Sequence, residues 1–172
     1  MIASLFAGAL LMADPVQLDC LLNEMSAAER TGMEQLIAER GPSSDPRTRA
    51  IYRVVQLCGQ RFHWSREAAG QAGGYLFSVI AAENARRQLA GRGINISQLE
   101  RMLLADPTLR DLPDGAGALE AAVNGFFDRN RAYVVGLAGP SPQDPRAVFG
   151  EIGIFMTSRV AMENGRTTFA RQ

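Results

Sequence analysis

Cys20 and Cys58 are the two residues of this chain whose chemistry is easiest to predict. They are its only cysteines and lie thirty-eight positions apart, without the C-x-x-C spacing of a redox or metal motif. An even cysteine count is typical of a disulfide formed in an oxidising compartment. We therefore predict a Cys20–Cys58 disulfide, which would stabilise the fold by about 4 kcal/mol if chain entropy dominates. Two buried free thiols are the alternative.

Glu83 is the one candidate for acid–base catalysis. It follows the apolar run YLFSVIAA and lies three and four residues after Ile80 and Val79, so it continues an apolar helical stripe. A carboxylate held there would tend to keep its proton and could act as a general acid. The simpler alternative, which we prefer, is an exposed ion pair with Arg87 one turn later.

His63 and Trp64 are candidate ligand-binding residues because they are the only histidine and the only tryptophan, and they are adjacent. A lone histidine cannot assemble a zinc site, so we expect no metal and no cofactor. A histidine at a helix end more commonly interacts with the helix dipole and the free carbonyls. No G-x-S-x-G or similar nucleophile motif accompanies it.

The charge balance disfavours nucleic acid as a partner. Eighteen basic residues offset eighteen acids, and every basic residue is arginine, which excludes lysine chemistry. Charge is nevertheless segregated: six acids and one arginine lie between residues 14 and 39, and six arginines and one acid between 40 and 66. This pattern could form an anion site on the basic segment, but we prefer pairing between an acidic hairpin and a basic helix.

Residues 1–13 (MIASLFAGALLMA) carry no charged side chain and have the length of a signal-peptide core, too short to span a bilayer. We therefore predict a signal peptide over 1–13, a single domain over 14–172, and a periplasmic or secreted location without a transmembrane segment in the mature chain. Cleavage would follow Ala13, or Ala9 if the small pair Ala7 and Ala9 forms the site. A buried first helix and a retained membrane anchor are the alternatives.

Helix signals punctuate the rest of the chain. Four Asp-Pro pairs predict helix starts, because aspartate caps free N–H groups and proline suits the first turn; they begin at Asp14, Asp45, Asp106 and Asp144. Ser26 with Glu29 and Ser97 with Glu100 match capping boxes, and Ser65 can cap a further helix. Glycines mark plausible helix ends at Gly41, Gly91, Gly139 and Gly165.

Apolar residues between these signals recur with helical spacing, and no segment alternates convincingly as a strand. We predict an all-α fold, a compact bundle of about six to seven helices without a β-sheet. The segments lie near 18–25, 27–40, 51–62, 65–90, 97–105, 118–137 and 145–156. Asn130 interrupts the apolar stripe of the sixth segment.

Small residues cluster on the fourth predicted helix, where Gly70 and Gly74 lie one turn apart beside Ala69 and Gly73. Glycine costs about 1 kcal/mol against alanine within a helix, so the cluster requires a cause. Close approach of another helix, a bend and access for a ligand are the three candidates. We expect the first, with the small residues of the sixth helix crossing there.

Two functions remain open. The first, which we prefer, is a binding or interaction module that presents a helical groove or face to another protein or an envelope component. The second is a small secreted all-helical hydrolase with Glu83 as its acid. The chain shows no complete catalytic motif, so an enzyme is the less favoured of the two.

Overall fold

A computed structural model describes residues 13–113, 116–139 and 144–172. Within these residues the protein is all helical, with eight α-helices and no strand. The predicted signal peptide lies outside the described residues except for Ala13. The α-helices are α1 (Asp19–Glu24), α2 (Ala27–Ala38), α3 (Arg49–Phe62), α4 (Arg66–Gly91), α5 (Ser97–Ala105), α6 (Ala116–Arg129), α7 (Arg131–Leu137) and α8 (Pro145–Phe169).

All four Asp-Pro pairs begin helices, as predicted. Asp144 accepts a hydrogen bond from Ala147 N–H at the start of α8. The other three aspartates cap short 3₁₀ helices in the same way, at Pro15–Leu18, Pro46–Thr48 and Pro107–Leu109. The capping box of Ser26 and Glu29 and the Ser65 cap of α4 are also confirmed.

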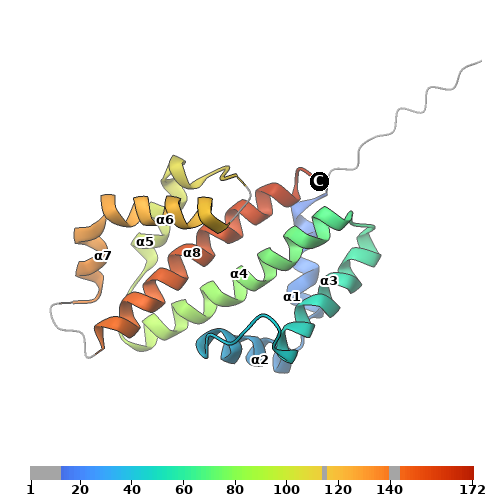
Figure 1. The fold of residues 1–172 in the computed structure, drawn as a ribbon, viewed down its shortest axis with the longest axis horizontal. Coiled ribbons are helices and arrows are strands. Elements are labelled where there is room, and N and C mark those ends of the chain that lie inside the picture. Colours follow the sequence, from blue (N-terminus) through green and yellow to red (C-terminus); the bar gives the residue numbers. More distant parts are fainter. Residues whose placement is uncertain (1–12, 114–115, 140–143) are drawn as a thin grey trace, which may run out of the picture.

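The two longest helices, α4 and α8, lie side by side and form the centre of the molecule. Helices α1 to α3 lie on one side of this pair, and α5 to α7 lie on the other (Figure 1). Since residues of α4 and α8 enter the apolar clusters on both sides, the central pair joins the two halves.

The apolar core has two parts. The N-terminal core packs α1 to α3 against the first half of α4 and includes Leu21, Met33, Val54, Leu76 and Phe169. The C-terminal core packs α5 to α7 against the second half of α4 and the first part of α8, and it includes Leu89, Leu99, Phe126, Val134 and Phe155.

The predicted cysteine pair is confirmed at disulfide distance. The sulfur atoms of Cys20 and Cys58 are 2.08 Å apart, and their Cα atoms are 6.1 Å apart. Both residues are buried in the N-terminal core, so the pair connects α1 to α3 across it.

Three local predictions about helix ends are wrong. The predicted sixth helix is divided into α6 and α7 at Asn130, whose side-chain amide donates to Phe126 O. Ser97 is the first residue of α5 and makes no capping bond, and Glu100 instead binds Arg86 and Arg159. Gly165 does not end a helix but lies inside α8, where a Cβ would be 3.6 Å from Tyr75 Cβ of α4.

The connection between α5 and α6 is tied to α8 by one amide. Asn164 donates to Leu109 O, and its Oδ1 accepts from Leu112 N–H at 3.0 Å. These bonds satisfy the carbonyl at the end of the 3₁₀ helix Pro107–Leu109 and an N–H of the segment that follows it.

Candidate functional site

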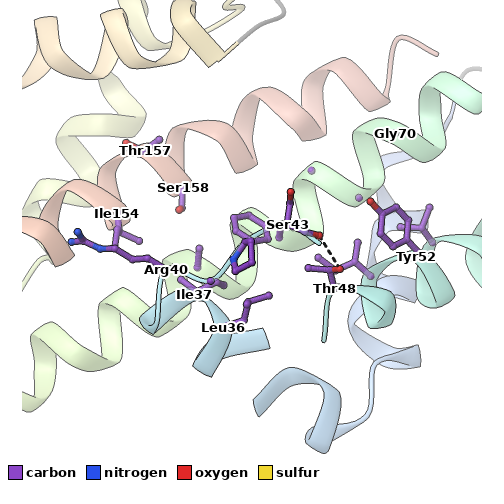
Figure 2. Close-up of a pocket in the computed structure, with 18 of the residues that line it drawn as sticks. Leu36, Ile37, Arg40, Ser43, Thr48, Tyr52, Gly70, Ile154, Thr157 and Ser158 are labelled. Atoms are coloured by element: carbon purple, nitrogen blue, oxygen red, sulfur yellow. Dashed lines mark hydrogen bonds between the residues drawn. The ribbon is translucent and has the colours of Figure 1, made fainter. Parts of the chain in front are cut away.

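The candidate site is an apolar groove of about 900 Å³ that is bordered by α2, α3, α4 and α8. The end of α2 and the loop after it line one edge, and α3 lines the next, with Ile51, Tyr52 and Val55. Figure 2 shows Arg40 and Ile154 near one end of this groove and Gly70 and Tyr52 near the other. A volume of this size is typical of a ligand site.

Glycines of α4 form part of the groove surface. A Cβ built at Gly70 or Gly74 would have no heavy atom within 4 Å. The prediction that the sixth helix crosses α4 here is therefore wrong, because α4 packs mainly against α8 and these glycines face open space. The third candidate explanation, space next to the helix for a ligand, matches their position in the groove.

A second set of glycines lines the groove from α8. Gly150 and Gly153 lie one turn apart, next to Phe149 and Ile154, which also line it. Sequence reasoning missed this set. The Gly-x-x-Gly spacing within an apolar helix was the available signal, but nothing local indicated that it would line the same groove as the glycines of α4.

Two aromatic side chains of the groove are largely uncovered. Tyr52 is 71% exposed and Phe77 is 43% exposed, and both line the groove. Ile51, Val55 and Ile154 are partly buried around them. Exposed rings gathered at one concavity are typical of a binding surface rather than of scattered surface residues.

Among the described residues that line the groove, Arg40 is the one that carries a charge. It follows α2 in a left-handed conformation, with φ of 52°, and Gly41 N–H donates to Leu36 O at 2.9 Å to close the helix end. Its Nη2 atom lies 3.4 Å from the position of a Cβ at Gly150, so the guanidinium reaches across to α8.

The acids nearest to Arg40 in the chain are engaged elsewhere. Glu39 and Asp45 both pair with Arg47, at 2.7 and 2.9 Å. Hydrogen bonds from Arg47 lower the pKa of Asp45 to about 2, so this carboxylate stays charged and bound. Within the described residues, Arg40 has no acidic partner.

A smaller hollow of about 640 Å³ lies between α6 and α8 and shares Phe149, Gly153 and Thr157 with the groove. The part of its lining that the structure describes includes an acid, Glu120, and no arginine. The two concavities therefore continue one apolar face of α8 but differ in the sign of their charge.

His63 and Trp64 lie outside the groove. His63 ends α3 with φ of 55° and is exposed. Trp64 is a packing residue: its ring meets Phe169 edge-on at 5.1 Å, and its Nε1–H donates to Gln17 Oε1 at 2.6 Å. Neither residue contributes to the groove, unlike Gly70 and Gly74.

Glu83 also lies outside the groove. Its side chain is 44% exposed and lies 3.7 Å from Arg30 of α2. The expected partner, Arg87, pairs instead with Glu34 at 2.6 Å. Both ion pairs join α2 to α4. Glu83 therefore takes part in a contact between helices and does not line the groove.

The segregated charges pair between helices, as the preferred interpretation predicts. Arg53 binds Glu29 and Arg61 binds Glu24, so α3 is joined to α1 and α2 along its edge. Hydrogen bonds from Arg53 and from Ser26 lower the pKa of Glu29 from 4.5 to about 2. These arginines are not available as a separate anion site.

Comparisons with protein-family models, with curated proteins and with solved structures gave no match for this chain. In the described ranges, no group of three or more His, Cys, Asp or Glu side chains is placed to hold a metal ion. None of the described helices combines the length and the apolar character that crossing a membrane requires.

Proposed function

We propose that this protein is a binding module and that the groove between α2, α3, α4 and α8 takes an elongated apolar ligand. The observation that carries the proposal is the open space above Gly70 and Gly74, bordered by the exposed rings of Tyr52 and Phe77. A helix interior that keeps two such glycines without a packing partner is destabilised by them, which supports a use for the open space itself.

The energetics of burial support this function. An aromatic side chain presents about 200 Å² in total. A ligand that covers half of the exposed area of Tyr52 and Phe77 would therefore bury on the order of 100 Å² of their surface. At about 25 cal/mol per Å², these two rings alone would contribute about 3 kcal/mol to binding. The partly buried aliphatic side chains beside them add further apolar contact.

Titration with N-phenyl-1-naphthylamine, an uncharged dye that emits strongly in apolar surroundings, tests the proposal. We expect saturable binding by the native protein and at least a tenfold loss of affinity in Gly74→Leu, whose side chain would occupy the groove. Gly136→Leu is the matched control, because Gly136 lies in α7, away from the groove, and also has open space at its Cβ. Equal binding by the native protein and Gly74→Leu would contradict the proposal.

We further propose that the protein acts outside the cytoplasm, in the periplasm or secreted. The paired cysteines support this location, since disulfides persist in oxidising compartments. The uncharged segment before Asp14 supplies the export signal in this proposal. Cell fractionation with N-terminal sequencing is the test: a mature end near Asp14, or near Leu10, is expected, and an intact Met1 on cytoplasmic protein would overturn it.

The hydrolase alternative has no observation in its favour. No carboxylate belongs to the described lining of the groove, and Glu83 is held at the α2–α4 contact. A function for Glu83 as general acid stays a prediction from the sequence.

A further inference from the structure

The groove has one charged end. Among the described lining residues, Arg40 is the single charge, and the remaining surface is aliphatic, aromatic, glycine or hydroxyl. The hydroxyl of Thr48 is already engaged, because it donates to the carbonyls of Ser43 and Asp45. A ligand that matches this surface is apolar along its length and negative at one end.

The backbone around Arg40 fixes this charge at the end of the groove. The left-handed conformation of Arg40 closes α2 and turns its side chain toward α8. The guanidinium lies over Gly150, where a methyl group would already be 3.4 Å from Nη2. Because Arg47 occupies both Glu39 and Asp45, the guanidinium keeps its donors for another acceptor.

The apolar part of the groove extends along α4. Its lining on α4 extends from Ala69 to Ala81, which corresponds to about 18 Å at the rise of an α-helix. A single extended hydrocarbon chain matches this length and the open space beside Gly70 and Gly74.

We infer that the groove binds long-chain fatty acids, with the carboxylate at Arg40 and the hydrocarbon chain over Gly74 and Gly70 toward Tyr52. This inference rests on the proposed function and specifies its ligand class. A guanidinium binds a carboxylate through two parallel hydrogen bonds, which single out a compact anionic head group. Because Arg40 is the single charge among the described lining residues, it sets the end at which the carboxylate lies.

The experiment compares palmitate with hexadecanol, which has the same chain length and an uncharged head group. Both are titrated below their aggregation limits at pH 8, by displacement of N-phenyl-1-naphthylamine. We expect the native protein to bind palmitate about tenfold more tightly than hexadecanol, since a hydrogen bond to a charged group contributes that order of affinity. Affinity should also rise with chain length from laurate to palmitate, by up to about fourfold per methylene.

Arg40→Gln should reduce palmitate binding to the level of hexadecanol and leave hexadecanol unchanged. Arg101→Gln is the matched control, because Arg101 is an exposed arginine of α5 that does not line the groove. Arg40→Lys should keep part of the preference for palmitate.

The outcomes separate this inference from the proposed function. Equal affinity of the native protein for palmitate and hexadecanol would overturn the fatty-acid inference and leave an apolar binding module. Failure to bind the dye, palmitate or hexadecanol would overturn both. An amphipathic acidic helical peptide that binds where palmitate does not would also overturn the inference, in favour of a protein partner.

Discussion

The two classes of helical glycine should respond in opposite ways to the same substitution. Gly74 of α4 faces the groove and has no atom within 4 Å of its Cβ position. Gly165 of α8 lies against α4, where Tyr75 Cβ and Cα would be 3.6 and 3.7 Å from a Cβ. Leucine should therefore be tolerated at position 74 and resisted at position 165.

The magnitudes follow from helix propensity and packing. Replacing Gly74 by alanine or leucine should stabilise the fold by up to about 1 kcal/mol, because both residues favour a helix and neither meets a neighbour. Leucine at position 165 gains the same propensity but must push α4 and α8 apart, at a cost of about 1–3 kcal/mol. Its net effect is a loss of up to about 2 kcal/mol. Alanine at position 165 makes only ordinary contacts and should not destabilise.

Thermal melts followed by circular dichroism measure the difference. For a chain of this size, 1 kcal/mol corresponds to about 2–4 °C in Tm. Gly74→Leu should raise Tm by about that amount, while Gly165→Leu should lower it by up to about 8 °C. A fall in Tm for Gly74→Leu would refute the assignment of the groove, and a rise in Tm for Gly165→Leu would refute the close helix contact.

Three further predictions concern the contacts that hold the fold. Removing the disulfide in Cys20→Ala/Cys58→Ala should cost about 4 kcal/mol and lower Tm by about 8–16 °C, and a change below 3 °C would mean that the link adds little. The Glu29–Arg53 pair should stabilise the protein above about pH 4.5 and lose its effect as pH falls toward 2, because the pKa of Glu29 is lowered to about 2 in the fold. Arg53→Gln should therefore lower Tm at neutral pH and flatten its decline in acid, whereas parallel Tm–pH curves would argue against the pair. Asn164→Ala should cost about 1–3 kcal/mol in urea unfolding, since it strands the backbone groups of Leu109 and Leu112; a loss below 0.5 kcal/mol would show that water replaces the amide.

Local signals predicted helix starts well because their physics lies within one turn. Each Asp-Pro pair positions a carboxylate next to free N–H groups whatever the rest of the chain does. The predicted Ser97 capping box does not form because of contacts with other helices. Ile96 is buried, and the carboxylate of Glu100 accepts hydrogen bonds from Arg86 of α4 and Arg159 of α8. Contacts from distant helices therefore overrode a local motif.

The groove could not be predicted because it depends on which helices become neighbours. The glycines of α4 were recognised as unusual, but propensity alone does not distinguish a helix contact from an open surface. Gly165, interpreted as a helix end, is the glycine at the close contact of α4 and α8, while Gly74 faces the groove. The position of Arg40 over Gly150 joins residues more than a hundred positions apart, so no local pattern contains it.

The environment of Trp64 has a consequence for how unfolding can be observed. As the only tryptophan, it makes intrinsic fluorescence a local signal of the N-terminal core, where its ring meets Phe169 and Phe62. Circular dichroism, in contrast, sums the helices on both sides of α4. Coincidence of the two transitions would show that α4 transmits the loss of one core to the other as a single cooperative event. Fluorescence that changes first would mean that the half closed by the disulfide melts while α5 to α7 still hold their helices.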